Sequence, residues 1–234
     1  MDISGSVALV TGSNRGIGRH FAAQLLARGA AKVYATARFP ERIDLPGVQT
    51  LRLDLTDPPS ITAAATAAAD VTVLVNNAGI ATGTNLLGEL DQIRLEMETH
   101  YFGTLSVIRA FAPVLGDNGG GAILNVLSAL SWFSFDGANA YAAAKAAEWS
   151  LTNGIRLELA TQGTQVTGVH VGAVDTDIMA GYDGPKVDPA DVARVALDGL
   201  QAGQMEVIVD DWSAMIKATL AGDPAAFYTP TGAA

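Results

Sequence analysis

The chain has 234 residues, of which 49% are hydrophobic and 16% are charged, as is typical of one folded α/β domain with a substantial core. Its formal net charge of −10 argues against nucleic acid as a partner, because an acidic chain repels phosphate backbones. The lack of cysteine excludes disulfides, thiolate catalysis and cysteine-based metal sites, and the three histidines are scattered, so we expect no metal.

The sequence shows no sign of targeting segments, linkers or repeats. The N-terminal residues lack the basic region and apolar run of a secretory signal, and no stretch of about 18 or more residues is apolar throughout. We therefore expect no membrane association and a cytoplasmic location. Residues 1–228 are expected to form a single domain, followed by a frayed tail at 229–234.

Strand-like and helix-like segments alternate along the chain. A valine-rich run at 7–10 predicts a buried strand, and Ile17, Phe21 and Leu25 then recur at helical spacing until Gly29 ends the helix. The later elements are expected, in chain order, as strands at 32–37 and 48–55, a helix at 58–69, a strand at 71–75, a helix at 89–115, a strand at 122–127, a helix at 138–161, a strand at 165–171, a helix at 189–200, a strand at 206–209 and a helix at 212–220.

This alternation predicts a doubly wound α/β fold, in which helices cover both faces of a parallel seven-stranded sheet. Ligands bind such sheets at the carboxyl ends of the strands, near the point where the strand order reverses. The loops that follow the strands are therefore where we expect a functional site.

A glycine-rich loop lies directly between the first strand and the first helix. Its sequence is Thr-Gly-Ser-Asn-Arg-Gly-Ile-Gly, with glycines at 12, 16 and 18. Glycine lets the backbone approach a ligand closely, and the N-terminus of a helix attracts phosphate. In this position we favour a dinucleotide-binding loop over a purely structural turn.

A second pattern is Tyr141-Ala-Ala-Ala-Lys145, inside a strongly helical stretch. Residues four apart share one face of a helix, so the ammonium of Lys145 is expected beside the phenol of Tyr141. A nearby cation favours phenolate, so we expect a lowered Tyr141 pKa and a phenol suited to general acid/base work. Taken alone, the pair could equally be packed or solvated.

Together these motifs resemble the short-chain dehydrogenase/reductase family. The glycine loop, Asn76-Asn-Ala-Gly79 after the fourth strand, Ser128 after the fifth, and Tyr141-x-x-x-Lys145 thirteen residues later follow the family's order. The resemblance covers about Ser6 to Asp211 and implies a Rossmann fold and a reductase or dehydrogenase acting on carbonyls and secondary alcohols.

The resemblance also implies roles for these residues. Tyr141 would be the general acid in carbonyl reduction, Lys145 would tune it and bind the nicotinamide ribose, and Ser128 would hold the substrate oxygen. Asp54 could alternatively cap a turn, and Asn76 could be structural. Besides Tyr141 and Lys145, the cofactor contacts implied are Gly12, Asn14, Arg15, Gly16, Ile17, Gly18, Arg38, Asp54, Leu55, Asn76, Ala78, Gly79, Val174 and Thr176.

The choice of cofactor depends on the end of the second strand. NAD enzymes usually place a carboxylate there, but this chain has Arg38. Arginine can pair bidentately with a 2′-phosphate, and Arg15 in the glycine loop could complete the clamp. We therefore expect NADP(H) over NAD(H), the alternative being two solvated arginines.

Two positions depart from the family pattern. His100 stands where the family often has an asparagine that links the lysine to solvent. It could replace that relay, because imidazole both donates and accepts hydrogen bonds, or the relay could be impaired, or His100 could be a packed structural residue. After the sixth strand, Val171-Gly172 replaces the more usual Pro-Gly, which leaves the geometry of the loop less certain.

Aromatic and apolar residues near the strand ends suggest an apolar, aryl-bearing substrate, although the rings could instead pack against a covering loop. Small residues at 138, 142 and 146 resemble the family's subunit contacts and suggest a homodimer or homotetramer. Two other readings are a catalytically weakened NADP(H)-sensing protein and a reductase of imines or activated C=C bonds. The substrate-binding candidates are Ser128, Leu130, Trp132, Phe133, Met179 and Tyr182.

Overall fold

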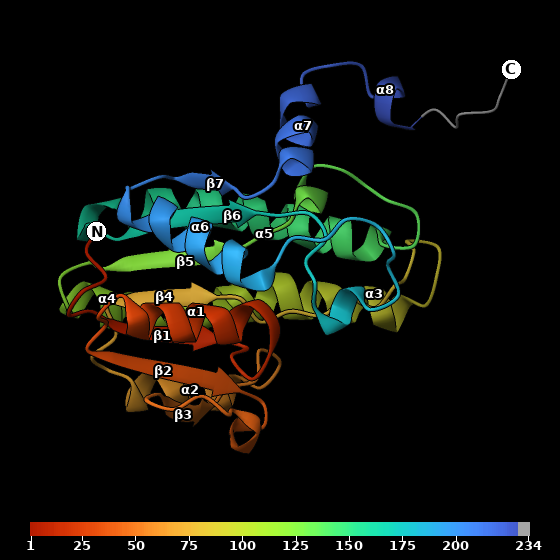
Figure 1. The fold of residues 1–234 in the computed structure, drawn as a ribbon. Coiled ribbons are helices and arrows are strands. Elements are labelled where there is room, and N and C mark those ends of the chain that lie inside the picture. Colours follow the sequence, from red (N-terminus) through yellow and green to blue (C-terminus); the bar gives the residue numbers. More distant parts are fainter. Residues whose placement is uncertain (229–234) are drawn as a thin grey trace, which may run out of the picture.

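Seven strands lie side by side in one parallel sheet, in the order β3-β2-β1-β4-β5-β6-β7 (Figure 1). The computed structural model describes residues 1–228, so the expected tail lies outside the described residues. The doubly wound α/β fold predicted from the sequence is confirmed. The strands are β1 (Val7–Thr11), β2 (Lys32–Ala37), β3 (Gln49–Arg52), β4 (Val73–Asn76), β5 (Ala122–Val126), β6 (Gln165–His170) and β7 (Glu206–Ile208).

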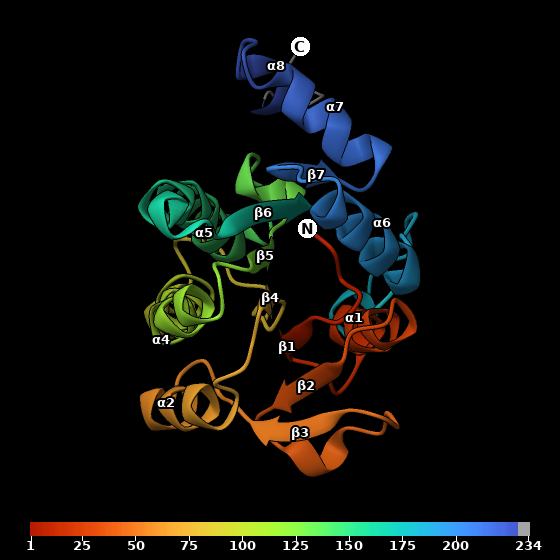
Figure 2. The same ribbon diagram turned by 90° about the vertical axis from the view of Figure 1, so that its left-hand side faces the viewer.

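Helices cover both faces of this sheet. α1 (Gly16–Ala27) and α6 (Pro189–Gln201) pack together on one face, and α2 (Pro58–Ala67), α4 (Thr104–Asp117) and α5 (Asn139–Glu158) lie on the other (Figure 2). Alternate residues of a strand point to opposite faces, so the two sides of the sheet build two separate cores. In β1, Leu9 joins the core that contains Phe111 of α4, and Val10 joins the core that contains Phe21 of α1.

The helix expected at 89–115 is interrupted. α3 (Leu90–Met97) passes into a π-helical turn over Glu98–Gly103 before α4 begins. Hydrophobic periodicity cannot reveal such a turn, because one extra residue per turn leaves most of the helical pattern intact. Gly103 packs closely there: a Cβ on it would lie 2.7 Å from Cβ of Leu55.

The edge strand β3 is also shorter than the expected 48–55. Its ladder with β2 ends at Arg52, and the backbone N–H of Leu53 donates one last hydrogen bond to the carbonyl of Ala37 at 3.0 Å. The following residues turn toward the carboxyl edge of the sheet. Most other element ends differ from the expected ones by one to three residues, as helix and strand ends usually do.

Beyond β7 the chain forms α7 (Asp211–Thr219) and α8 (Ala225–Tyr228), which project away from the sheet (Figure 1). Asp210 fixes this segment, because its carboxylate caps α7 at the N–H of Ser213 (2.9 Å) and accepts the N–H of Gly172 at 2.8 Å. Short 3₁₀ turns complete the structure at Pro40–Arg42, Ala129–Ser131, Ala160–Gln162 and Asp177–Met179.

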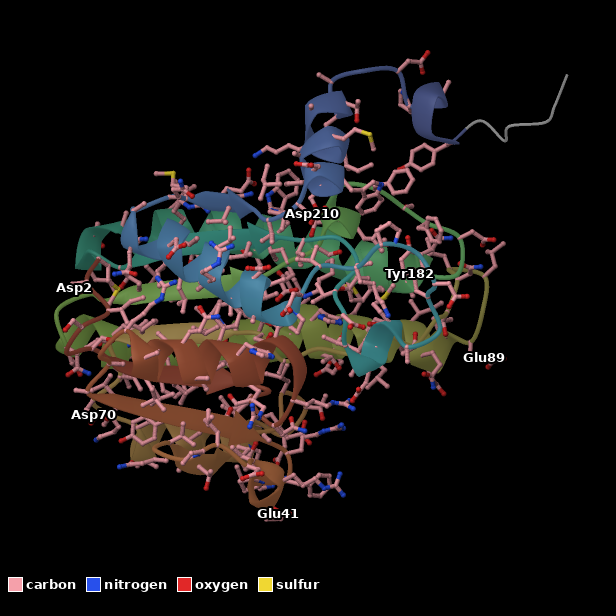
Figure 3. All side chains as sticks on the ribbon, in the orientation of Figure 1. Asp2, Glu41, Asp70, Glu89, Tyr182 and Asp210 are labelled. Atoms are coloured by element: carbon pink, nitrogen blue, oxygen red, sulfur yellow. The ribbon has the colours of Figure 1, made fainter. Side chains whose placement is uncertain are left out.

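The strand order reverses between β1 and β4, so a crevice forms at their carboxyl ends. In Figure 3, Tyr182 and Glu89 lie at the end of the molecule toward which the strands point, and Asp2 and Asp70 lie at the opposite end. Within residues 1–228, no helix has both the length and the apolarity needed to span a membrane.

Candidate active site

A cleft of about 1280 Å³ opens at the carboxyl ends of the strands. Segments that follow all seven strands contribute to its walls. All four predicted catalytic residues, Ser128, Tyr141, Lys145 and His100, line it. The predicted cofactor residues in its walls are Gly12, Asn14, Arg15, Gly16, Ile17, Arg38, Asp54, Leu55, Ala78, Gly79, Val174 and Thr176.

The glycine loop forms one wall of the cleft. Gly12 adopts a positive φ of 70°, which side chains disfavour, and a Cβ on Gly18 would lie 2.2 Å from the carbonyl oxygen of Gly12. Gly18 therefore allows the loop to fold against α1 without itself lining the cleft. The first turn of α1 has no acidic residue and no side-chain cap, so its N–H groups and positive dipole end favour phosphate.

The adjacent residues Asn76 and Asn77 differ in their surroundings, because one is buried in the sheet and the other lines the cleft. Asn76 is buried in the sheet, where its Nδ2 donates to Oδ1 of Asn125 at 2.8 Å, and it is not part of the cleft wall. The structural role considered for Asn76 is therefore present, because it ends β4 with its side chain facing β5. Asn77, which we did not select from the sequence, lines the cleft and donates to the carbonyl of Thr11 at 3.0 Å, thereby fixing the glycine loop.

Three arginines gather at the end of the cleft beside β1 and β2. Arg15 forms an exposed ion pair with Asp177 at 2.6 Å, Arg38 follows β2, and Arg42 lies over the ring of Phe39. Arg42 was missed in the sequence; its signal was a second basic residue soon after the second strand. The cluster is positive in a protein that is acidic overall.

Asp54 and Leu55 contribute the facing wall of the cleft near these arginines. Oδ1 of Asp54 accepts hydrogen bonds from the backbone N–H of Thr56 at 3.0 Å and from its hydroxyl at 2.9 Å. The turn role considered for Asp54 is therefore present, and it is compatible with a place in the cleft wall.

Ser128, Tyr141 and Lys145 meet at the other end of the cleft. Ser128 follows β5, and its hydroxyl lies close enough to the phenol of Tyr141 on α5 to lower the pKa of that phenol. Nζ of Lys145 lies 5.8 Å from the centre of the Tyr141 ring and donates to the carbonyl of Val126 at 2.9 Å. The helical spacing thus places the phenol and the ammonium side by side, and the segment after β5 adds the hydroxyl of Ser128.

Burial raises the pKa of Tyr141 above its usual value. Lys145 pulls this pKa down, as expected, and so does the hydroxyl of Ser128, whereas the carboxylates of Glu148 and Glu96 push it up. The expected net lowering is therefore wrong for the protein alone. A phenol that stays protonated through neutral pH is suited to donating a proton.

His100 lies directly beneath this group. Its ring meets the ring of Tyr141 edge to face, with centroids 5.2 Å apart, and only 1% of the residue is exposed. Gly79 provides the space for it, because a Cβ on Gly79 would lie 2.6 Å from Cε1 of the imidazole. His100 therefore belongs to the site and is also tightly packed.

The predicted substrate residues separate into two groups. Leu130, Met179 and Tyr182 line the cleft, but Trp132 and Phe133 do not. Trp132 stacks on His170 with centroids 3.7 Å apart, and Phe133 stacks on Tyr228 at 5.4 Å, so these rings pack against the end of β6 and against α8. Phe135, one of the aromatic residues that suggested an aryl-bearing substrate, also lines the cleft. Asp210 and Trp212 line it too and were not selected from the sequence; Asp210 is visible in Figure 3 close to the loop after β6.

Comparison with known proteins agrees with this geometry. The family model described as short chain dehydrogenase matches residues 6–185. A crystal structure of a short chain dehydrogenase from Burkholderia cenocepacia J2315, in complex with NADP, is 38% identical in sequence with a TM-score of 0.93, covering 98% of each chain. The chain therefore belongs to the short-chain dehydrogenase/reductase family, whose members are oxidoreductases.

Two curated relatives are similar over about three quarters of the chain. The 3-oxoacyl-[acyl-carrier-protein] reductase of Vibrio cholerae is 36% identical over 190 residues, which are 76% of this chain and 77% of that protein. The NADPH-dependent 1-acyldihydroxyacetone phosphate reductase of Schizosaccharomyces pombe is 35% identical over 182 residues, which are 74% of this chain and 61% of that protein.

Proposed function

We propose that the protein is an NADP(H)-dependent reductase of ketones that also oxidises the corresponding secondary alcohols. The observation that carries this proposal is the convergence of Ser128, Tyr141 and Lys145 at one end of a cleft whose other end is a phosphate-binding loop. A cofactor that spans the cleft would place its nicotinamide beside the phenol.

Three features support NADP(H) as the cofactor. Arg15, Arg38 and Arg42 line the cleft and could pair with a 2′-phosphate, and β2 is followed directly by Arg38 instead of a carboxylate. The similar Burkholderia dehydrogenase was crystallised with NADP, and the Schizosaccharomyces reductase is NADPH-dependent. The uncapped N-terminus of α1 fits the pyrophosphate.

The protein's own groups would bind, orient and protonate the substrate. NADPH, when bound, supplies the hydride. Ser128 holds the carbonyl oxygen, and Tyr141 donates its proton to that oxygen as negative charge develops there. The contacts of Lys145 with Val126 and Glu148 use two of its three N–H donors, which leaves one for the cofactor ribose.

The substrate portion of the cleft is largely apolar. Leu130, Phe135, Met179 and Tyr182 line it, and Trp212 closes it from α7. These side chains favour an apolar or aryl-bearing ketone over a sugar or a charged acid. With Trp132 and Phe133 packed elsewhere, the preference depends on a smaller set of rings than the sequence suggested.

The proposal is tested by following NADPH oxidation with a panel of ketones, using Tyr141→Phe as the control. We expect turnover that the Tyr141→Phe change abolishes. Cofactor binding without turnover on the whole panel would contradict the proposal and favour an NADP(H) sensor. Turnover only on imines or activated C=C bonds, identified by product analysis, would also contradict it.

We further propose that the protein forms a homodimer or homotetramer. The small-residue stripe is a weak argument, because Ala142 is buried within its own chain. A better candidate is the exposed side of α5, where Leu157 is 78% exposed. Light scattering should show an oligomer that Leu157→Asp weakens; a monomeric wild type would contradict the proposal. The cytoplasmic location stays a prediction.

A further inference from the structure

A cluster of four ionisable side chains is buried under the reaction centre. Glu96 comes from α3, His100 from the π-helical turn, and Lys145 and Glu148 from α5. Their exposed fractions are 0%, 1%, 5% and 2%, respectively. Ionisable groups are seldom buried unless they are paired, so the arrangement of these four needs a physical explanation.

Glu148 links the lysine to the histidine. Its Oε2 lies 2.6 Å from Nζ of Lys145 and 3.8 Å from Nδ1 of His100, and its Oε1 accepts a hydrogen bond from Thr104 at 3.2 Å. The 3.8 Å separation exceeds a hydrogen bond, but a shift of roughly 0.6–1 Å would close it. One carboxylate oxygen therefore lies between a potential proton donor and the ammonium that serves Tyr141.

The imidazole of His100 is held from its other side. Nε2 lies 2.9 Å from the carbonyl oxygen of Ile80 and 3.3 Å from Oε2 of Glu96, and we assign it as the donor because the contact with the carbonyl is shorter than the 3.4 Å from the N–H of Ile80. Glu96 is itself fixed by the backbone N–H of Thr82 at 2.6 Å. Within residues 1–228, Nδ1 of His100 has no hydrogen-bond partner, and the nearby carboxylate of Glu148 is where a second proton on the ring would point.

Charge balance gives the cluster two states. With both glutamates ionised and Lys145 protonated, the cluster is neutral when His100 carries a second proton and has one negative charge when it does not. Burial by itself would raise the pKa of Glu96, but its contacts with His100 and Thr82 hold that pKa below its usual value. The described residues contain no group with the arrangement of a metal site, and Lys145 would repel a cation here.

We propose that Glu96, His100 and Glu148 store one proton for the Tyr141–Lys145 pair, with His100 as the group that gains and loses it. The proposal rests on the reductase function above. Tyr141 gives its proton to the substrate oxygen, and Lys145 returns one to the tyrosinate. His100 gives its Nδ1 proton, through Oε2 of Glu148, to Lys145, and solvent reprotonates the imidazole between turnovers. One proton moves in each step and no electrons do.

Glu96 and Glu148 are positioning residues in this scheme. They explain why a histidine stands where the family often has an asparagine: an asparagine between two buried carboxylates would leave one negative charge uncompensated. The proton store is not needed for the first turnover, because Tyr141 is already protonated when the first substrate arrives. Its loss should therefore slow repeated turnover more than the first turnover.

Rapid mixing tests this distinction. The enzyme with bound NADPH is mixed with a ketone substrate, and NADPH absorbance is followed through the first and later turnovers. For His100→Asn we expect a first turnover within about threefold of the wild-type rate and a steady-state kcat reduced about tenfold or more, in the range of general acid–base effects. A steady-state kcat equal to wild type, or a first turnover slowed as much as the steady state, would overturn the proposal.

A second variant covers the case in which His100→Asn does not fold. Glu148→Gln keeps the side-chain shape but removes the charge that raises the pKa values of both Lys145 and Tyr141. We expect lower kcat and a basic limb of the kcat–pH profile displaced to lower pH. A basic limb that stays in place, or moves to higher pH because Lys145 has been displaced, would indicate a purely structural role.

Glu98→Gln is the matched control, because Glu98 lies two residues from Glu96 on the same turn but is exposed. It should match the wild type in both experiments. A wild type that turns over no ketone would refute the proposed function, whereas an active wild type with unaffected cluster variants would refute the proton store alone.

Discussion

Arg15 reaches across the mouth of the cleft and forms a 2.6 Å ion pair with Asp177, joining the glycine loop to the segment that follows β6. The two side chains are 62% and 71% exposed, so water screens the pair and its net contribution is small, on the order of 0.2–1 kcal/mol. An incoming 2′-phosphate would compete with Asp177 for the same guanidinium.

Removing this competitor should strengthen NADPH binding. For Asp177→Asn we expect a Kd for NADPH about two- to fivefold lower than that of the wild type, with the gain reduced at high salt. Fluorescence titration measures this affinity, and NADH, which lacks the 2′-phosphate, serves as the control and should bind unchanged. Equal gains for both cofactors would show that Asp177 acts on the loop and not on Arg15.

Arg38 should determine the choice between the two cofactors. Arg38→Asp replaces a donor to the 2′-phosphate with a repelling carboxylate, and we expect kcat/KM for NADPH to fall about tenfold to a hundredfold while that for NADH holds or rises. The same charge reversal at Arg94, which is 69% exposed on α3, provides the control. A wild-type preference for NADH would disprove the cofactor assignment.

The parts of the site that the sequence predicted well are set by short-range spacing. Gly12, Gly16 and Gly18 stand in one turn, and Tyr141 and Lys145 share one face of α5, so local geometry alone brings each group together. The fold follows from the alternation of strand and helix patterns, because connections in parallel sheets leave few alternatives.

The parts that it did not predict depend on contacts between distant segments. The net rise of the Tyr141 pKa comes from burial and from Glu148 and Glu96, and the latter lies on a different helix. The ring of Trp132 stacks on His170 of β6, and no local sequence pattern predicts this contact. An aromatic side chain near a site can line the cleft or pack outside it, and its residue type does not show which of these positions it takes.

The raised pKa of Tyr141 predicts the pH dependence of the reaction. The phenol is protonated below its pKa, so ketone reduction should hold a steady kcat through neutral pH and fall only above about pH 10, the ordinary tyrosine value. Alcohol oxidation needs the phenolate and should increase with pH over the same range. Initial rates in both directions across pH 6–11, on the order of half-unit steps, would test this. A reduction rate that already declines between about pH 7 and pH 9 would contradict it.

His170 should make the fold sensitive to acid. Burial lowers its pKa to about 4, with the nearby positive charges of Lys217 and Lys145 acting in the same direction, so the folded protein keeps the ring neutral while the unfolded chain binds a proton near pH 6.5. The unfolded state binds more protons between these two values, and stability is therefore lost as pH falls through this window, by roughly 3 kcal/mol in all.

Urea unfolding at a series of pH values should show this loss. His170→Gln, which keeps a donor for the carbonyl of Ser128, should have a shallower slope, and His20→Gln controls for the removal of a histidine. Parallel slopes for the wild type and His170→Gln would mean that other groups cause the acid sensitivity.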